Sequence, residues 1–452
     1  MRAMLRATVL LVGLSLLACG KRRSAADAPD GPATSAAGQP AIPKPSGACT
    51  LAESATLTDI EQIAAGETHA CGVRRDGRVV CWGDNSSGQL GVAPNAPGGP
   101  VLVCGLSDAV EVSVTQYHSC ARTKDGSVWC WGFNASGELG DGTTHASRTP
   151  VRVAGLGPAK GVSVASFHSC ALEADGGVAC WGMNTAAVLG TPSPDKLLTP
   201  ARVPDLKDAV RVVTGSSSTC VLRRDATVAC WGETRGGPLG YVRTAAPTPM
   251  AGASDVSSVS HGWYRGCAIR KNGSVACWGG DATPLGWSLG EPIPGVSDAV
   301  EVAVGLREAC VRRRDGRVSC WVDRSEPQDV PQVRGATSIA LGQAFGCARM
   351  PDASVKCWGA DPETVLAERN RAEAERRKQW EAAGKLCPID EIVVYGSPGC
   401  GKQAAHRCVK AIPPCADQFC GCDGREVGGC GVAVAPYRHA GPCRGDGGAP
   451  EL

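Results

Sequence analysis

This 452-residue sequence has little net charge and no long apolar run. Its 46 Lys and Arg residues nearly balance 44 Asp and Glu residues, which leaves a net charge of +2. A chain so close to neutrality lacks the basic footprint of a nucleic-acid-binding protein. Its N-terminal apolar run, Ala7–Ala18, is shorter than the roughly 20 residues that a membrane-spanning helix needs. We therefore expect no nucleic-acid partner, and we interpret this run as a secretory signal.

Cysteine, by contrast, is abundant and periodic. Seven times a cysteine is followed ten positions later by a second cysteine and then at once by tryptophan. A repeat with a period of roughly 20–50 residues indicates a solenoid, a propeller or an array, because one unit cannot bury its apolar face alone. The paired cysteines are Cys71 and Cys81, Cys120 and Cys130, Cys170 and Cys180, Cys220 and Cys230, Cys267 and Cys277, Cys310 and Cys320, and Cys347 and Cys357.

Each unit has the pattern of a β-hairpin. An Asp or Asn lies midway between the two cysteines, and Gly follows it in five units. Such a dipeptide between apolar runs predicts a three-residue loop that ends in a left-handed residue. If Arg75–Gly77 is that loop, Arg74 faces Arg78 and Cys71 faces Cys81. The two α-carbons would then lie roughly 4.5 Å apart, which is within disulfide reach.

Two other states of these cysteines are possible. Reduced cysteine behaves as a small apolar core residue. Zinc ligands usually lie two to four residues apart, so seven isolated pairs on separate units would make poor tetrahedral sites. We favour one disulfide in each hairpin, worth roughly 2.5–3 kcal/mol in the loop-entropy model.

The N-terminal segment 1–19 predicts export. Leu16–Cys19 resembles a bacterial lipoprotein cleavage box, which implies cleavage before Cys19 and lipidation of its thiol. The alternative is an ordinary signal peptide that is cut elsewhere. Gly20, rather than Asp, follows the cysteine, which favours sorting to the outer membrane. Export would place the other cysteines in an oxidising compartment, where disulfides persist.

Residues 20–48 are rich in Ala, Pro, Ser and Gly, and we interpret them as a flexible tether. Lys21, Arg22 and Arg23 could touch anionic lipid or form a solvated charge run. Apart from Cys19, 24 of the 25 cysteines remain, an even number. Cys49 and Cys104 belong to neither the hairpins nor the tail, so we pair them with each other, although Cys49 could also reach the tail.

The segments after the tryptophans carry a second pattern. The first two units continue Trp-Gly-Asp-Asn-Ser-Ser-Gly-Gln-Leu-Gly (82–91) and Trp-Gly-Phe-Asn-Ala-Ser-Gly-Glu-Leu-Gly (131–140). This pattern is similar to the repeat of the regulator of chromosome condensation family, whose seven units form a seven-bladed β-propeller. The resemblance implies an all-β fold over residues 49–361. The cysteine pairs that we expect to form the hairpin disulfides replace an apolar pair usual in the nuclear members of the family.

The later units depart from this pattern. Units four to seven lose much of the segment after the tryptophan, and the spacing between units falls from 49 or 50 residues to 37. We therefore expect fewer or shorter outer strands in the later blades. The best-known activities of the family are nucleotide exchange on a small nuclear GTPase and chromatin binding. This chain matches none of the residues that carry exchange, so we expect no small GTPase partner.

We find no catalytic constellation in the sequence. His69, His118 and His168 each lie two residues before a cysteine, but equivalent positions on different blades are spread around a ring and cannot converge on a metal. We expect these histidines to form structural hydrogen bonds within each blade. A lyase or glycosidase is disfavoured because no converging pair of carboxylates can be located. We predict no enzyme activity, no catalytic residue, no cofactor-binding residue and no metal ligand.

Beyond the repeats we expect a charged helical spacer at 362–386 and a cysteine-rich module at 387–452. Eight cysteines in this module indicate a small domain held by disulfides. Gly396–Gln403 nearly spells a phosphate-binding loop, but Gln403 replaces the hydroxyl residue, so we predict no nucleotide there. Phe419–Gly424, Cys430 and His439–Cys443 are similar to part of a Kazal-type inhibitor module. A generic adhesive or structural module is the alternative.

Together these features predict a binding or scaffold protein of the bacterial cell envelope, anchored by lipid at the outer membrane. Propellers commonly present loop surfaces to partners. The expected partner is an extracellular or envelope protein or a glycan. The alternative function is inhibition of an extracellular hydrolase through the propeller face or the Kazal-like tail.

Overall fold

The computed structural model describes residues 55–92, 99–192, 195–235, 241–263, 265–279, 287–322, 325–343 and 345–359, together with residue 375 and the segments 391–395, 406–410, 419–421, 426–427 and 437–440. The chain divides into two compact units, Met1–Lys44 and Pro45–Leu452, and all described residues belong to the second. The predictions for Cys19, the tether, Cys49 and, except for the helical residue 375, the spacer lie outside the described residues.

Seven antiparallel sheets follow one another along residues 60–359, and we number them as blades 1 to 7. Within each blade the strands lie side by side in chain order. The first three blades have four strands each: blade 1 comprises β1 (Ile60–Ala65), β2 (His69–Arg74), β3 (Val79–Gly83) and β4 (Val101–Leu102); blade 2 comprises β5 (Ala109–Val114), β6 (His118–Thr123), β7 (Val128–Gly132) and β8 (Ser147–Arg152); blade 3 comprises β9 (Ala159–Ala165), β10 (His168–Glu173), β11 (Val178–Met183) and β12 (Lys196–Arg202).

The later blades vary in their outer strand. Blade 4 comprises β13 (Ala209–Thr214), β14 (Ser218–Arg223), β15 (Val228–Arg235) and β16 (Tyr241–Pro249); blade 5 comprises β17 (Val256–His261), β18 (Arg265–Arg270) and β19 (Val275–Gly279); blade 6 comprises β20 (Ala299–Val304), β21 (Glu308–Arg313), β22 (Val318–Val322) and β23 (Gln328–Asp329); blade 7 comprises β24 (Ser338–Leu341), β25 (Phe345–Arg349) and β26 (Val355–Gly359). Among the described residues, the expected trimming occurs in blades 5, 6 and 7. It does not occur in blade 4, whose outer strand has 9 residues.

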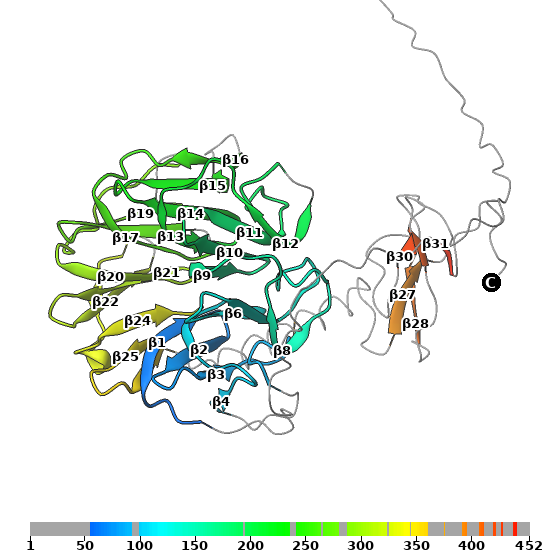
Figure 1. Cartoon of the computed structure of the whole chain (residues 1–452), viewed down its shortest axis with the longest axis horizontal. Helices are drawn as coiled ribbons and strands as arrows, with labels where there is room; N and C mark the ends of the chain where they lie inside the picture. Colours follow the sequence, from blue (N-terminus) through cyan, green and yellow to red (C-terminus); the bar gives the residue numbers. More distant parts are fainter. Residues whose placement is uncertain are drawn as a thin grey trace, which may run out of the picture. The chain divides into compact units, whose positions relative to one another are not determined.

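The last blade closes the ring against the first, and the blue and yellow sheets lie side by side in Figure 1. Arg349 of β25 donates from Nε to the Ile60 carbonyl and forms an ion pair with Glu61 at 3.1 Å. The Ile60 amide in turn donates to the Ala353 carbonyl at 2.9 Å. One apolar cluster joins residues of β1 and β25, including Ile63 and Phe345. The predicted seven-bladed propeller is confirmed.

The hairpins form as their turn chemistry predicts. The Asp76 carboxylate accepts the Arg78 amide at 3.0 Å, and Gly77 takes the left-handed conformation with φ 80°. This loop pairs Arg74 with Arg78 and sets Cys71 opposite Cys81. In two units alanine replaces the glycine and still adopts positive φ, 66° at Ala226 and 62° at Ala353. The turn geometry therefore holds even where the residue disfavours it.

Each of the seven hairpins carries its disulfide, with α-carbons 3.9–4.1 Å apart. The predicted pairing is confirmed in every blade. The disulfides join Cys71 to Cys81, Cys120 to Cys130, Cys170 to Cys180, Cys220 to Cys230, Cys267 to Cys277, Cys310 to Cys320 and Cys347 to Cys357.

The outer strands pair less regularly than the hairpins. In blade 2 the register between β7 and β8 shifts after Cys130, and in blade 4 the register between β15 and β16 shifts after Cys230. A shift of this kind marks a bulge in one strand of a pair. The bulges leave the hairpins intact, because Cys130 still faces Cys120. In the same way, Cys230 still faces Cys220.

The hairpin disulfides differ in exposure. Most of their cysteines are buried, but Cys277 is half-buried and Cys357 is exposed. These two lie on β19 and β26, the outermost strands of the three-stranded blades. Cys104 is also disulfide-bonded, and its partner is not one of the fourteen hairpin cysteines. Its pairing with Cys49 stays a prediction.

The hydrophobic core lies between blades rather than within them. One cluster combines Cys71 and Val73 of blade 1 with Val112 and Trp131 of blade 2. The next clusters likewise join blades 2 and 3, and then blades 3 and 4. Each blade therefore needs a neighbour to bury its apolar face, as expected for a repeat protein.

The described part of the C-terminal module is also made of strands. β27 (Glu391–Tyr395) pairs antiparallel with β28 (His406–Lys410), and β29 (Phe419–Gly421) lies between β30 (Glu426–Val427) and β31 (Tyr437–Ala440). The antiparallel partner of β27 is unlike the parallel sheet of a nucleotide-binding fold. Among the described residues, no helix combines the length and the apolarity needed to cross a membrane.

Candidate binding face around the propeller axis

The first strands of all seven blades line one channel along the propeller axis. Its volume is about 670 Å³, and strand alternation directs every second side chain into it. Several of these side chains bind the neighbouring blade. The Gln62 amide group both donates to and accepts from the backbone of Val112, and the Glu301 carboxylate accepts the Ile339 amide. The channel is thus held together by hydrogen bonds from blade to blade.

At one end of the channel, the turns between the first and second strands meet around the axis. We call this end the turn face, formed by residues 66–68, 115–117, 166–167, 215–217, 262–263, 305–307 and 342–343. Glycine is required at several turns because the blades approach closely. A Cβ added to Gly262 would collide with the carbonyl oxygen of Gly305, and one added to Gly342 would collide with that of Gly66. The last contact joins blade 7 to blade 1.

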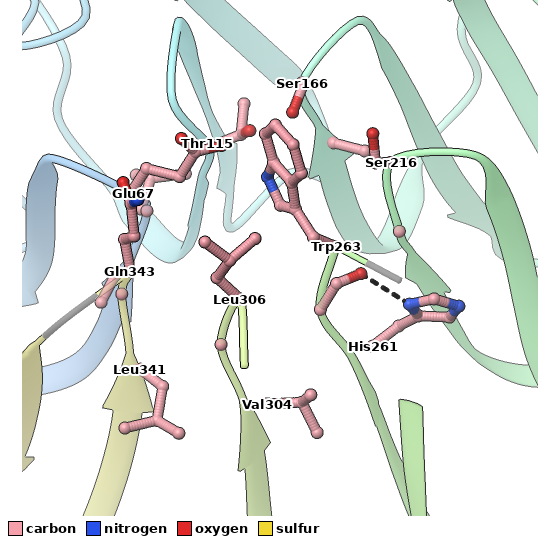
Figure 2. Close-up of a pocket in the computed structure, with 18 of the residues that line it drawn as sticks. Glu67, Thr115, Ser166, Ser216, His261, Trp263, Val304, Leu306, Leu341 and Gln343 are labelled. Atoms are coloured by element: carbon pink, nitrogen blue, oxygen red, sulfur yellow. Dashed lines mark hydrogen bonds between the residues drawn. The ribbon is translucent and has the colours of Figure 1, made fainter. Parts of the chain in front are cut away.

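The turns enclose a pocket on the axis, which we call the axial pocket. Its volume is about 80 Å³. Figure 2 shows the indole of Trp263 lying across it, with Glu67 and Thr115 on one side and Ser216 on the other. Leu306 lies beneath the indole in this view. The pocket therefore combines an aromatic face, a carboxylate and hydroxyl groups contributed by different blades.

The lining of the axial pocket favours a ligand that donates hydrogen bonds. The Ser166 hydroxyl lines it and is buried without a hydrogen-bond partner among the described residues. Glu67 and His261 are the ionisable residues of the described lining, which includes no Lys or Arg. His261 donates from Nδ1 to the Gly262 carbonyl at 2.7 Å and accepts from Ser218 Oγ at Nε2. Burial lowers the pKa of His261 to about 4, so the imidazole is neutral at pH 7.

An arc of aromatic residues adjoins the axial pocket: Tyr117 and Phe167 belong to the turn face, and Phe133 follows β7 and packs beside Tyr117. The ring of Tyr117 lies 5.5 Å from that of Phe167 and 5.7 Å from that of Phe133. All three are half-buried, and Phe167 directly follows the pocket residue Ser166. Aromatic residues make up only 4% of the chain, and most of its tryptophans serve the blade repeat. This aromatic arc, Tyr117/Phe133/Phe167, therefore marks a surface suited to recognition.

The repeated histidines do not lie in this site, and their predicted hydrogen bonding within each blade is wrong. His69 bonds Ser119 Oγ at 2.9 Å, His118 bonds Ser169 Oγ at 2.8 Å and His168 bonds Thr219 Oγ1 at 3.0 Å. Each bond joins one blade to the next, because the start of the second strand faces the adjacent blade. Burial lowers the pKa of all three histidines to about 3, so they are neutral. Their role is structural, as expected, but their hydrogen bonds join neighbouring blades.

The segment after each early tryptophan holds the next blade. The carbonyl oxygen of Gln89 accepts both the Trp131 indole N–H at 2.8 Å and the Ser119 hydroxyl at 2.9 Å. The same pattern recurs at Glu138 with Trp181 and at Val188 with Trp231. In the described part of the chain, the indole N–H groups of Trp278, Trp321 and Trp358 have no such partner. The later units have therefore lost an interblade contact along with the sequence pattern.

The comparisons with known proteins decide the family. A family model described as an RCC1-like domain matches residues 34–385, which is more than half of the chain. The chain belongs to the RCC1-like domain family. No curated protein matches its sequence.

Solved structures show the same fold as this RCC1-like chain. Prp20p from Saccharomyces cerevisiae has a TM-score of 0.56 and 17% identity, with 70% of this chain and 86% of that chain covered. Yeast RCC1 (Prp20) bound to Kap60 has a TM-score of 0.55 and 16% identity, with coverage of 70% and 83%. Human WBSCR16 has a TM-score of 0.47 and 21% identity, with coverage of 63% and 70%. At these identities the likeness to the two yeast structures shows the fold alone.

In this RCC1-like propeller, the sequence located the blades but not the candidate binding face. Thr68, Tyr117 and Phe167 occupy one repeat position, directly before the second strand. A bulky aromatic residue at this position in two consecutive units was the feature of the sequence that could have predicted the aromatic arc. Among the described residues, Glu308, Cys310 and Cys320 cluster within 4.8 Å, but both cysteines are disulfide-bonded and cannot bind a metal as thiolates.

Proposed function

We propose that this chain is a binding or scaffold protein of the bacterial cell envelope that recognises a protein or a glycan through its turn face. The observation that carries the proposal is the aromatic arc beside the axial pocket. Half-buried Tyr and Phe side chains offer a large apolar contact area at little entropic cost, and they are enriched at recognition surfaces. The family of the chain and its propeller fold fit a binding or scaffold role.

The envelope location rests on the sequence. The lipoprotein-like box at Leu16–Cys19 supports a lipid anchor, and seven hairpin disulfides fit an oxidising compartment. We propose attachment at the outer membrane through Cys19. Replacing Cys19 by Ala in the full chain should move the protein from the membrane fraction to the soluble fraction and abolish incorporation of labelled fatty acid. Membrane retention of C19A would contradict the lipid anchor.

Prp20p is a yeast protein described with its binding to Gsp1p and histones. Partners of this kind do not suit an exported, nearly neutral chain, so we propose neither a small GTPase nor chromatin as its partner. The partner is instead an extracellular or envelope molecule.

Affinity capture tests the use of the turn face. The full-length, oxidised protein serves as bait for envelope and secreted fractions of the source cell. A triple variant, Tyr117→Ala/Phe133→Ala/Phe167→Ala, should lose the captured partner while keeping its folding transition. The matched control is Val210→Ser/Val300→Ser, because these valines are 47% and 40% exposed and lie on first strands outside the turn face.

Each result of the capture decides between named alternatives. Loss in the arc variant with retention in the control supports recognition by the turn face. Equal capture by both variants rejects the turn face. Capture of a hydrolase whose activity falls when bait is added would replace the scaffold role with inhibition.

A further inference from the structure

We propose that the axial pocket receives one basic side chain, Lys or Arg, from a loop of a partner protein. This inference rests on the proposed function and names the chemistry that the turn face recognises. The aromatic arc would contact the rest of the loop, while the axial pocket holds the cationic group.

The first argument is size. The axial pocket has a volume of about 80 Å³, well below the roughly 300–1,000 Å³ typical of pockets for small-molecule ligands. It can accept the end of a side chain, with the rest of the ligand remaining on the surface. An inserted side chain is how a protein loop commonly anchors itself in a partner.

The second argument is charge. Glu67, with 9% exposure, supplies a buried carboxylate, and no Lys or Arg lies among the described lining residues. Arg307 lies in one of the turns and Arg265 begins β18, but neither lines the axial pocket. His261 adds no positive charge at pH 7, because burial holds its pKa at about 4 and keeps the imidazole neutral. The lining is therefore complementary to a cation.

The third argument is the geometry of acceptors. Ammonium and guanidinium groups donate hydrogen bonds and accept none. The buried Ser166 hydroxyl is without a partner among the described residues and can accept one of these bonds. The indole of Trp263 crosses the axial pocket in Figure 2 and offers the aromatic face that binds cations best. A neutral glycan would stack on the indole but carries no positive charge to pair with the Glu67 carboxylate.

Fluorine NMR of the full-length, oxidised protein labelled with 5-fluorotryptophan tests this pocket directly. The Trp263 resonance is assigned by its disappearance in Trp263→Phe. The probes are the capped tripeptides Gly-Arg-Gly and Gly-Lys-Gly, the neutral analogue Gly-citrulline-Gly, and chitobiose as a glycan. The basic peptides should shift the Trp263 resonance saturably, whereas citrulline and chitobiose should leave it in place.

Two variants test the residues that hold the cation. Glu67→Gln keeps the side-chain shape and should weaken binding of the Arg peptide by about tenfold or more, as expected for loss of a charge-assisted hydrogen bond. Ser166→Ala should weaken it by about threefold, since a neutral acceptor contributes less. Glu326→Gln is the matched control, because it removes the same charge at an exposed position outside the pocket. Thermal unfolding checks that each variant is folded.

Several results would overturn the inference. These are an equal shift with the citrulline peptide, unchanged binding by Glu67→Gln, or a shift with chitobiose alone. The aromatic arc variant separates this failure from failure of the proposed function. If that variant loses the captured partner while the basic peptides do not bind, the turn face remains the recognition surface and the cation pocket is rejected.

Discussion

His69 of blade 1 bonds Ser119 of blade 2 at 2.9 Å between Nε2 and Oγ, and Ser119 donates its hydroxyl hydrogen to the Gln89 carbonyl. Because a hydroxyl has one hydrogen, His69 must donate from Nε2. The Trp131 indole N–H reaches the same carbonyl oxygen. The boundary between these blades therefore depends on a buried hydrogen-bond chain.

Removing the middle of this chain should destabilise the protein. Ser119→Ala leaves the His69 N–H buried without an acceptor, so we expect a loss of about 1–3 kcal/mol in the free energy of unfolding. Ser119→Thr should lower the free energy of unfolding much less, because Thr219 forms the equivalent hydrogen bonds between blades 3 and 4. Guanidinium denaturation of the oxidised proteins measures the free energy of unfolding of both variants. Equal stability of S119A and wild type would contradict the role of this bond.

Acid should destabilise the propeller through its buried histidines. The pKa of His69, His118 and His168 is about 3 in the folded protein, against about 6.5 for an unfolded histidine. Between these values the unfolded chain binds more protons, so stability falls as the pH falls below about 6.5. Above about pH 6.5 these histidines are neutral in both the folded and the unfolded chain, so they no longer lower the stability.

Melting temperatures measured from pH 7.5 to 4.5 check this expectation. The triple variant His69→Gln/His118→Gln/His168→Gln can still donate from its amides but cannot titrate. Its melting temperature should therefore depend less on pH than that of the wild type. The same slope in both proteins would show that other groups cause the acid sensitivity.

The disulfides should differ in their resistance to reduction. Cys357 is exposed and Cys277 half-buried, and both lie on the outermost described strands of three-stranded blades, whereas Cys170 and Cys180 are fully buried. A thiolate must reach a sulfur to attack it, so Cys347–Cys357 should be reduced first and Cys267–Cys277 next. Differential alkylation under mild reduction, read by mass spectrometry, gives the order. Earlier reduction of Cys170–Cys180 would refute it.

The close approach of the turns predicts a strict need for glycine. In Gly262→Ala the new Cβ meets the Gly305 carbonyl of the next blade, so the blades must separate at a cost of about 1–3 kcal/mol or more. Gly157→Ala is the matched control, because its Cβ would meet nothing nearer than Glu173 Oε1 at 3.9 Å. In thermal unfolding, the melting temperature of G262A should lie well below that of the wild type, and that of G157A should lie close to it.

Local features of the propeller were predictable because neighbouring residues decide them. The Asp76-Gly77 turn sets the register that brings Cys71 opposite Cys81, and the same turn recurs in each unit. The shortened repeats likewise predicted that blades 5 and 7 would be smaller, and each has three strands in the described part of the chain. Blade 4 was mispredicted in this respect because β16 (Tyr241–Pro249) forms without the sequence pattern of the early units.

The sequence by itself determined the number of blades, their hairpins and their disulfides, since each depends on residues about ten positions apart within one repeat. Only the tertiary structure decided that His69 bonds Ser119 and that Glu67, Ser166 and Trp263 meet in one pocket. These contacts join different blades, and their geometry depends on how the blades pack and on closure of the ring. No local pattern encodes that closure, because it is a property of all seven blades together.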